Sequence, residues 1–118
     1  MKKVFVLLFL TMLSLSFVAC SNNADDRTIN HFLQAFEDDG FDTSNRQSSF
    51  FQMIGANDGM QFIIDGSHHT IYSFESVNTL EQAFRDHPFM ETQGWVANGR
   101  FVIESNVDEI NEFFRNIE

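Results

Sequence analysis

The chain contains a single cysteine, Cys20, and no other reactive side chain has a setting that the sequence defines so well. Cys20 follows the 16-residue segment 4–19, which is apolar except for Thr11, Ser14 and Ser16 and is preceded by two lysines. A basic start followed by such a segment is typical of a cleaved export signal, and the segment is short for a membrane-spanning helix, which needs about 20 residues. Export places Cys20 in an oxidising compartment, where we expect an unpaired exposed thiol to be modified.

The residues Phe17-Val18-Ala19-Cys20 resemble the bacterial lipobox, in which Leu, two smaller residues and Cys are read by the lipoprotein-processing enzymes. Ala19 fits this pattern, whereas Phe17 stands where Leu is usual. The resemblance implies that residues 1–19 are a lipoprotein signal peptide and that Cys20, as the first residue of the mature protein, carries a thioether-linked diacylglycerol. Ordinary secretion with an unmodified thiol and an uncleaved leader are the alternatives.

Lipid on Cys20 would tie the protein to a membrane without help from the protein surface. Each buried methylene contributes about 0.8 kcal/mol, so two acyl chains anchor a protein stably where one chain is marginal. We therefore expect a lipid-anchored protein on the extracytoplasmic face of the cell membrane. Residues 20–27 are predicted to form the lipidated tether, and residues 28–118 a single small acidic domain.

The 99 residues that remain without the leader are enough for one compact domain. Five arginines stand against 17 carboxylates, a net charge of −12, and this part of the chain has no lysine. Nucleic-acid binding needs clustered Lys and Arg, so we expect no nucleic acid among the partners. Repulsion from an anionic bilayer should also keep the body of the protein off the membrane surface.

Histidines are the first candidates for metal ligands, and the sequence after the leader has four: His31, His68, His69 and His87. Adjacent residues on a strand point to opposite faces, so His68 and His69 do not ligate one metal from a regular strand. We interpret the four as solvated surface histidines. A zinc or copper site completed by nearby carboxylates is the alternative.

Two acidic clusters are candidates for calcium binding. Asp38, Asp39 and Asp42 supply several oxygens but lack the alternating acids, the central Gly and the closing Glu of an EF-hand loop. The second cluster, 108–112, is better explained as carboxylates that favour the positive end of a helix dipole. We therefore predict no metal site and no cofactor.

Catalytic patterns are missing from the sequence. The serines that could act as nucleophiles lack glycine-flanked surroundings, and Gly55–Gly59 has no following Lys to form a phosphate-binding loop. We predict that the protein is not an enzyme and has no catalytic residue. The aromatic residues Phe50, Phe51, Tyr72 and Trp95 are interpreted as core, with a ligand groove or a protein-binding face as the alternative.

Apolar spacing defines the first and last helices. The stripe Ile29, Phe32, Leu33 and Phe36 predicts a helix over 27–39 that ends at Gly40. A cap pair, Asn106 and Glu109, and apolar residues from 107 to 117 predict the closing helix. A third helix is expected from a cap pair at Asn78 and Glu81 to about residue 87, before Pro88.

Turn signals define the strands. Asp65-Gly66 predicts a hairpin between 60–64 and 69–74, and Asn98-Gly99 predicts another between 95–97 and 100–104. Segment 42–49 is expected to be a loop, 50–54 a short strand, 55–59 a turn and 89–94 irregular. The predicted order is α-β-β-β-α-β-β-α. This indicates an α+β fold, a mostly antiparallel sheet of four to five strands with about three helices packed on one face.

A second resemblance covers about the last 60 residues. Asp58-Gly59, Ile71–Phe74, Trp95–Gly99 and the phenylalanine-rich closing helix are similar to small Gram-positive lipoproteins of unknown function. Because these motifs are structural, the resemblance implies no chemistry.

We expect a membrane-anchored lipoprotein that acts as a non-enzymatic protein-interaction module, with a protein of unknown identity as its partner. The alternatives are a small ligand- or metal-binding lipoprotein and the precursor of a signal-peptide-derived pheromone. Segment 13–19 resembles the apolar peptides that some Gram-positive bacteria release from lipoprotein leaders. The sheet face opposite the helices should separate the first two possibilities. An exposed apolar patch there favours interaction, and a closed polar pocket favours ligand binding.

Overall fold

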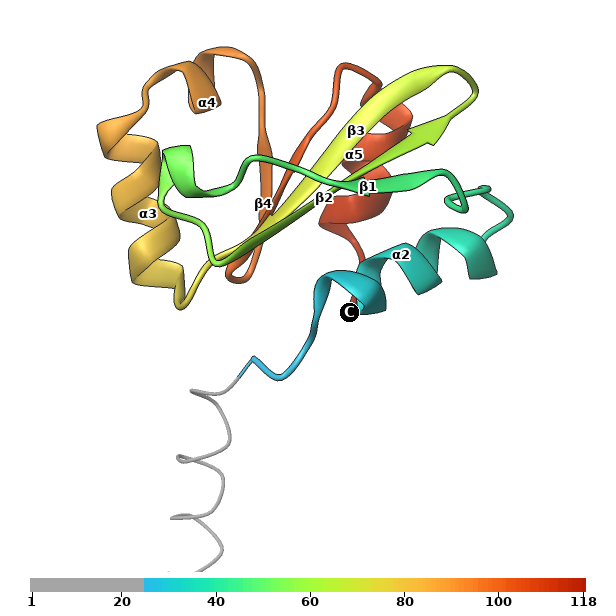
Figure 1. Ribbon diagram of the computed structural model, residues 1–118, viewed down its shortest axis with the longest axis horizontal. Coiled ribbons are helices and arrows are strands. Elements are labelled where there is room, and N and C mark those ends of the chain that lie inside the picture. Colours follow the sequence, from blue (N-terminus) through green and yellow to red (C-terminus); the bar gives the residue numbers. More distant parts are fainter. Residues whose placement is uncertain (1–24) are drawn as a thin grey trace, which may run out of the picture.

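Residues 25–118, the part of the chain that the computed structural model describes, form an antiparallel sheet with helices on both of its faces (Figure 1). The signal peptide predicted for 1–19 and the lipidation predicted at Cys20 lie outside the described residues. The helices are α2 (Ile29–Asp38), α3 (Val77–Asp86), α4 (Phe89–Thr92) and α5 (Asp108–Arg115), with a short 3₁₀ helix, η1 (Gln52–Ile54). The strands are β1 (Arg46–Ser48), β2 (Asp58–Ile64), β3 (Ser67–Ser73), β4 (Val96–Asn98) and β5 (Phe101–Glu104), in the spatial order β1-β2-β3-β5-β4.

The first hairpin forms as predicted, with Asp65 and Gly66 as its two turn residues between β2 and β3. Both have positive φ, 51° and 80°, which is the requirement of a type I′ turn. The pairing sets Gln61 opposite Thr70 and Phe62 opposite His69. This register fixes which side chains of β2 and β3 share a face of the sheet.

The second hairpin is displaced by one residue from the prediction. Asn98 pairs with Phe101, so the turn residues are Gly99 and Arg100 rather than Asn98 and Gly99. Asn98 stays in β4 because its side-chain amide donates to the carbonyl oxygens of Phe114 and Ile117, at 2.9 and 2.8 Å. Gly99 takes φ 61° at the first turn position, as in a type II′ turn.

Two segments before β2 differ from the prediction. The expected loop 42–49 contains the edge strand β1, whose three residues are all exposed and therefore carry no apolar signal. The expected strand 50–54 contains η1 instead, closed by Gly55 at φ 80°. The predicted turn 55–59 is shorter than expected, because β2 already begins at Asp58.

The helix starts also differ from the prediction in detail. Ser76 caps α3, since its hydroxyl accepts the N–H of Thr79 at 3.1 Å, so the proposed Asn78–Glu81 capping pair is wrong. Before α5, the hydroxyl of Ser105 accepts the N–H of Val107 at 3.1 Å, and the predicted cap pair at Asn106 does not form. The segment expected to be irregular contains the one-turn helix α4.

The two faces of the sheet carry separate cores. Helices α2 and α5 cover the first face, where Phe32, Phe36 and Phe114 pack on strand residues such as Ile71. On the second face, α3, α4 and η1 enclose Tyr72, the neighbour of Ile71 on β3 (Figure 1). The α+β class and the antiparallel sheet are confirmed. The expectation that the helices pack on one face is corrected, because Tyr72 and its neighbours bury a second apolar surface there.

Candidate functional site

Three features of the described chain could serve a function: the point where the chain enters the fold, a hollow on the second face of the sheet, and a group of exposed apolar side chains. The residue with the clearest sequence signal, Cys20, precedes all three and lies outside the described residues. The described chain begins five positions later, at Asp25.

The chain entrance is held by a bidentate ion pair. The Nε and Nη2 atoms of Arg27 each donate to a carboxylate oxygen of Asp25 at 2.9 Å. Its Nη1 donates to Oδ1 of Asn98 at 3.0 Å, which connects the entrance to the second hairpin. The hydrogen bond and charge of Arg27 lower the pKa of Asp25. Because bidentate Arg–carboxylate pairs have a defined geometry, Asp25 is fixed to the body of the domain.

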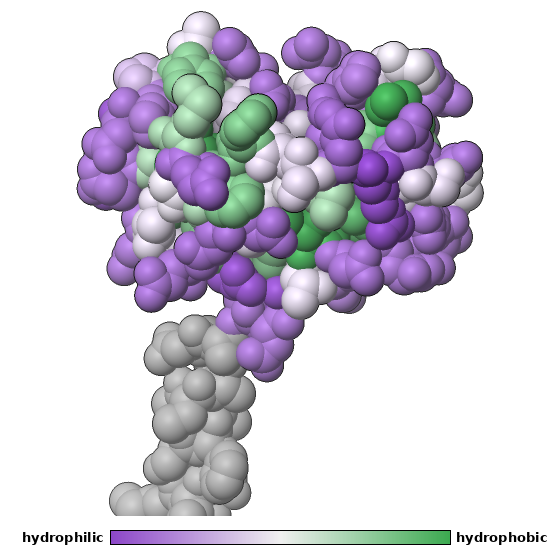
Figure 2. Space-filling view, viewed as in Figure 1, coloured by the Kyte–Doolittle hydropathy of each residue, from purple (hydrophilic) through white to green (hydrophobic). Residues whose placement is uncertain are grey.

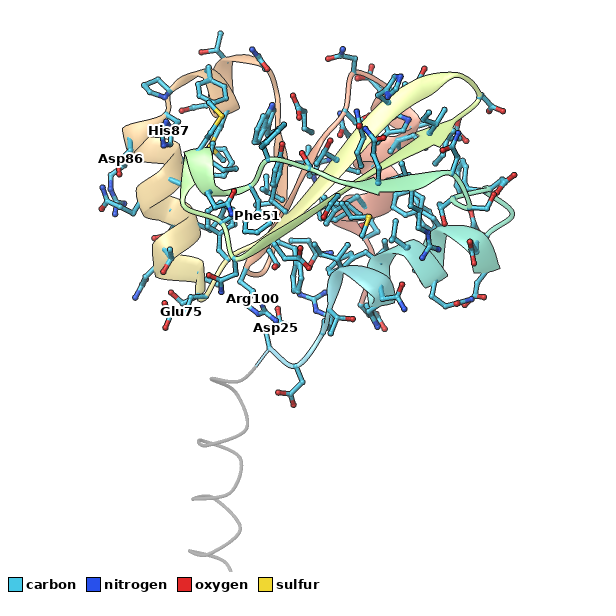
Figure 3. The ribbon with its side chains drawn as sticks, in the orientation of Figure 1. Asp25, Phe51, Glu75, Asp86, His87 and Arg100 are labelled. Atoms are coloured by element: carbon cyan, nitrogen blue, oxygen red, sulfur yellow. The ribbon has the colours of Figure 1, made fainter. Side chains whose placement is uncertain are left out.

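Arg100 completes this entrance from the second hairpin turn. Its guanidinium donates to three backbone carbonyl oxygens, those of Asp25 at 3.2 Å, Arg27 at 2.7 Å and Phe74 at 2.8 Å. The guanidinium also lies over the ring of Phe101, 4.5 Å from its centroid. Figure 3 shows Arg100 and Asp25 together where the described chain enters the fold. Residues 25–27, predicted as tether, therefore belong structurally to the body.

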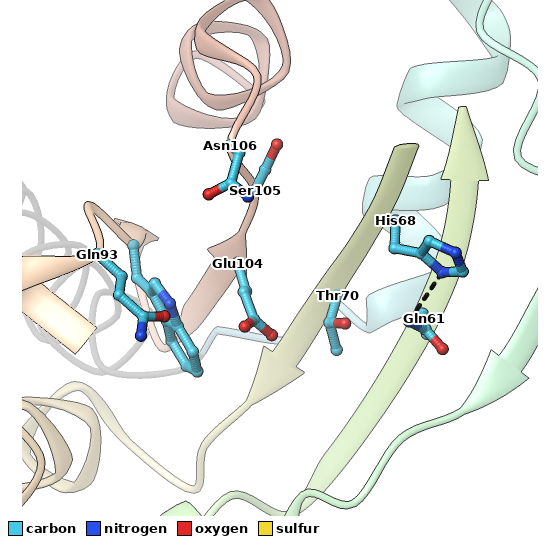
Figure 4. Close-up of a pocket in the computed structure, with 8 residues that line it drawn as sticks. Gln61, His68, Thr70, Gln93, Glu104, Ser105 and Asn106 are labelled. Atoms are coloured by element: carbon cyan, nitrogen blue, oxygen red, sulfur yellow. Dashed lines mark hydrogen bonds between the residues drawn. The ribbon is translucent and has the colours of Figure 1, made fainter. Parts of the chain in front are cut away.

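A hollow of about 240 Å³ opens on the part of the second face that α3 and α4 leave uncovered (Figure 4). We call it the polar pocket. Thr70 pairs with Gln61 on one side and with Glu104 on the other, so these three side chains share the sheet face that lines it. The full lining is Gln61, His68, Thr70, Gln93, Trp95, Glu104, Ser105 and Asn106.

Glu104 is the half-buried carboxylate of the polar pocket. Burial raises the pKa of Tyr72, and the negative charge of Glu104 raises it further, so the phenol stays protonated near neutral pH. The Tyr72 hydroxyl donates to Oε1 of Glu104 at 3.4 Å. At the other end of the pocket, Nε2 of Gln61 lies 3.0 Å from Nδ1 of His68 (Figure 4).

Aromatic residues of the second core form one wall of the polar pocket. Trp95 lines the pocket and is 9% exposed, and it stacks on Tyr72 with ring centroids 5.4 Å apart. Phe89 meets the Trp95 ring edge to face at 5.6 Å. The indole nitrogen of Trp95 is buried without a hydrogen-bond partner among the described residues. The core interpretation holds for Trp95 and Tyr72.

Exposed apolar side chains gather near this wall. Phe50 and Met53, on either side of the start of η1, are 85% and 80% exposed, and Phe89 at the start of α4 is 43% exposed. We call Phe50, Met53 and Phe89 the exposed apolar group. Figure 2 shows apolar residues gathered over the region of η1 and α4. The core interpretation is therefore wrong for Phe50, whose ring packs outside both cores.

The histidines do not share one environment. His31 and His68 are exposed and His87 is half-buried, but His69 is 1% exposed, so the surface interpretation is wrong for it. Nδ1 of His69 lies 2.7 Å from the Ser105 hydroxyl, and burial lowers the pKa of His69. This Ser–His contact lies on the helix-covered first face, where Ser105 also accepts the N–H of Val107. We assign the pair a structural role.

The predicted acidic clusters are not brought together with other ligands. Within residues 25–118, no group of three His, Cys, Asp or Glu side chains lies close enough to hold a metal ion. Asp42 instead accepts hydrogen bonds from the N–H and hydroxyl of Ser44, which lower the pKa of Asp42. Asp108 and Glu109 occupy the first turn of α5, where carboxylates favour the helix dipole.

Sequence reasoning missed the polar pocket and the entrance network. His68 and Thr70 are two residues apart on β3 and therefore point to the same face, and the correct hairpin registers would have placed Glu104 on that face beside Thr70. The entrance network has no such signal. Arg100 bonds to backbone carbonyl oxygens, which every residue supplies, and Arg27 bonds to Asn98, which is distant in the sequence.

Comparisons with protein-family models, curated proteins and solved structures found no match to this chain. None of the helices in residues 25–118 has the length and apolar character that crossing a membrane requires.

Proposed function

We propose that this protein is a lipid-anchored, extracytoplasmic membrane lipoprotein whose domain is a non-enzymatic protein-interaction module. The exposed apolar group is the observation that supports the interaction role. Phe50 and Met53 leave most of their side-chain surface in water, at 85% and 80% exposure. Apolar groups that are exposed together on an otherwise polar surface are typical of protein-binding sites.

The anchor adds to this role by confining the domain to a surface. Two molecules held on one membrane meet at a raised effective concentration, so a small apolar contact suffices for association. The strongly acidic composition favours a basic or neutral partner over nucleic acid or an anionic lipid surface.

Capture from membranes tests the interaction role. The full-length protein is expressed in its own host, cross-linked in intact cells and recovered from solubilised membranes. We expect one protein to be captured by the natural chain and lost with the double substitution Phe50→Ser and Met53→Ser. Val77→Ser is the matched control, because Val77 is also an exposed apolar side chain, 48% exposed, but begins α3. Equal capture by all three chains, or no captured protein, would contradict the proposal.

Mass spectrometry tests the anchor. The amino-terminal peptide of the native protein should begin at Cys20 and carry the mass of a diacylglyceryl group, with or without a further acyl chain. Cys20→Ser should move the protein out of the anchored membrane fraction. An unmodified Cys20, or native protein recovered free in the medium, would overturn this part of the proposal.

The polar pocket supports a second candidate function, binding of a small ligand. Its amide, hydroxyl and carboxylate groups converge on one hollow, as in ligand sites. Calorimetry of the mature protein against a set of polar metabolites and divalent metals tests this candidate. It fails if none of them releases heat or raises the unfolding temperature. The pheromone alternative concerns segment 13–19, outside the described residues, and stays a prediction.

A further inference from the structure

The lining of the polar pocket contains a negatively charged side chain and no positively charged Lys or Arg. Among its eight residues, Glu104 is the only carboxylate, and Lys and Arg are absent. The remaining polar side chains that face the pocket are amides, a threonine hydroxyl, an imidazole and an indole, and none of them is a carboxylate. A ligand with a negative charge would be repelled by Glu104, whereas a positive one would be attracted.

Glu104 has capacity left to bind such a ligand. It accepts one long hydrogen bond, 3.4 Å, from the hydroxyl of Tyr72. None of the ion pairs in residues 25–118 involves it; these join Arg27 to Asp25, Arg46 to Glu37 and Arg115 to Glu112. A half-buried carboxylate forms stronger charge-assisted hydrogen bonds than a fully solvated one, because the local dielectric constant is lower.

The size of the hollow limits what it can hold. Its volume of about 240 Å³ is below the roughly 300–1,000 Å³ of sites for drug-sized ligands. One long side chain is a better match than a cofactor. The carboxylate with its surrounding amide oxygens suits the several N–H donors of a guanidinium or an ammonium group.

The pocket is also continuous with the exposed apolar group. Trp95 lines the pocket and contacts Phe89, which is one of the three residues of the exposed apolar group. A protein segment that covers Phe89 therefore passes beside the pocket. Its own charge should be positive, because the chain after Ala19 has a net charge of −12.

We infer that the polar pocket binds the guanidinium or ammonium group of an Arg or Lys side chain of the partner protein, with Glu104 as the counter-ion. This rests on the proposed function and specifies it, because it makes the partner a basic segment with apolar residues beside the charge. Glu104 and the pocket amides recognise the cation, and Phe89 contacts the adjoining apolar residue.

Trp95 reports on this site directly, because it is the single tryptophan of the chain. The mature lipidated protein in detergent is titrated with Nα-acetyl-arginine amide and, in parallel, with Nα-acetyl-citrulline amide, which has nearly the same shape without the charge. We expect a saturable change in Trp95 emission and in its indole N–H resonance with the arginine compound only. Equal responses to both compounds, or no response to either, would overturn the inference.

Two charge-matched variants locate the binding group. Glu104→Gln should weaken binding of the arginine compound by at least about ten-fold, because a charge-assisted hydrogen bond is lost. Glu81→Gln, at an exposed position of α3, removes the same charge and should change binding by less than two-fold. Glu104→Asp retains the charge and should bind with intermediate strength, which keeps the test decisive if Glu104→Gln folds poorly. Unchanged binding by Glu104→Gln would overturn the inference.

The results also separate this inference from the proposed function. If a partner is captured and Glu104→Gln captures it equally well, the interaction role is supported, but the proposed binding of a cationic side chain in the polar pocket is wrong. If Trp95 responds to the arginine compound but no partner is captured, the interaction role falls. The cation must then come from a free amine rather than a protein side chain.

Discussion

His69 joins strand β3 to the start of α5. Its Nδ1 contacts the Ser105 hydroxyl at 2.7 Å, and Ser105 accepts hydrogen bonds from the N–H of Val107 and, at its carbonyl, from the amide of Asn111. Nε2 of His69 is buried without a partner among the described residues. A charged imidazole would therefore be poorly solvated there, which is why the pKa of His69 is lowered, with the neighbouring His68 as a smaller cause.

The lowered pKa of His69 predicts a pH-dependent stability. Unfolded histidine titrates near 6.5, so below that pH the unfolded chain binds a proton that the folded chain does not. The contribution of His69 to the free energy of unfolding should be fully present well above pH 6.5 and should be lost as the pH falls below it, by at most about 1.4 kcal/mol per pH unit. Urea unfolding at pH 7.5, 6.5 and 5.5 measures this slope. The pKa of Asp25, lowered from 3.8, places its titration below that range.

Substitutions assign the slope to one residue. His69→Gln should flatten the dependence between pH 6.5 and 5.5, since no imidazole is left to protonate. His87→Gln, at a half-buried position on the C-cap of α3, should leave it as it is. If His69→Gln retains the natural slope, burial of this imidazole is not its cause.

Gly99 offers a second test at the residue scale. A Cβ there would lie 2.6 Å from Nη2 of Arg27 and 2.7 Å from Oδ2 of Asp25, whereas a Cβ at Gly66 would meet nothing within 4 Å. Both glycines have positive φ, so an Ala side chain costs roughly 1 kcal/mol at either turn. Gly99→Ala should lose about 1 kcal/mol more than Gly66→Ala, because it also displaces the Arg27–Asp25 pair. Equal losses in urea unfolding would show that this pair adds nothing to stability.

At the scale of elements, capping decides where α3 begins. Two residues near its start have side chains suited to capping, Ser76 and Asn78, but only the Ser76 hydroxyl accepts a helix N–H. Ser76→Ala should lower the free energy of unfolding by about 1 kcal/mol. Asn78→Ala, at an exposed position inside the helix, should have no effect or a slightly stabilising one. The reverse order of effects in thermal or urea unfolding would place the cap at Asn78.

Elements with a buried apolar stripe were predictable from sequence. Helix α2 repeats Ile29, Phe32, Leu33 and Phe36 on one side, and all four are buried. The turn residues of the first hairpin were also predictable, because Asp and Gly are residue types that adopt positive φ in such turns. Such patterns are local, so the sequence contains all the information that they need.

Elements that depend on distant partners were not predictable. Strand β1 has no buried residue, and its pairing with β2 defines it. The register of the second hairpin depends on Asn98 finding carbonyl oxygens on α5 and after it. The polar pocket follows from both hairpin registers together, since Gln61, Thr70 and Glu104 come from three strands. The residue pattern within one segment does not show which distant segment it pairs with or in which register.

At the scale of the whole molecule, the two faces of the sheet differ in how completely they are covered. The first face carries two amphipathic helices and a phenylalanine-rich core. The second face is covered over part of its area, which leaves the polar pocket beside Trp95 and the exposed apolar group. The sheet therefore has one covered side and one partly open side, and the contacts that we propose are all made on the second face.

The entrance network determines how the proposed anchor is connected to that sheet. Five steps of the chain separate Cys20 from Asp25, which span at most about 18 Å when fully extended. Because Asp25 and Arg27 are bonded to Asn98 and Arg100, the body begins there rather than at residue 28. Lipid on Cys20 would then hold the domain close to the bilayer, with the entrance end nearest to it.

Trypsin tests this connection, because it cleaves after Arg and the chain after Ala19 has five arginines and no lysine. Cleavage after Arg27 would release the whole body from an anchored protein. The bond is protected in the folded state, since the Arg27 side chain is paired with Asp25 and its carbonyl accepts a hydrogen bond from Arg100 at 2.7 Å. We expect membranes that carry the natural protein to release the body slowly.

Substitutions that open the network should speed this release. Arg100→Lys removes the planar group that bonds three carbonyl oxygens, and Asp25→Asn removes the charge that pairs with Arg27. Both should release the body several-fold faster, as local opening becomes more frequent. Arg85→Lys, at an exposed position of α3, is the control and should behave like the natural protein. Release at one common rate would show that the network does not hold the chain entrance closed, and the domain would then hang on a tether that extends to Arg27.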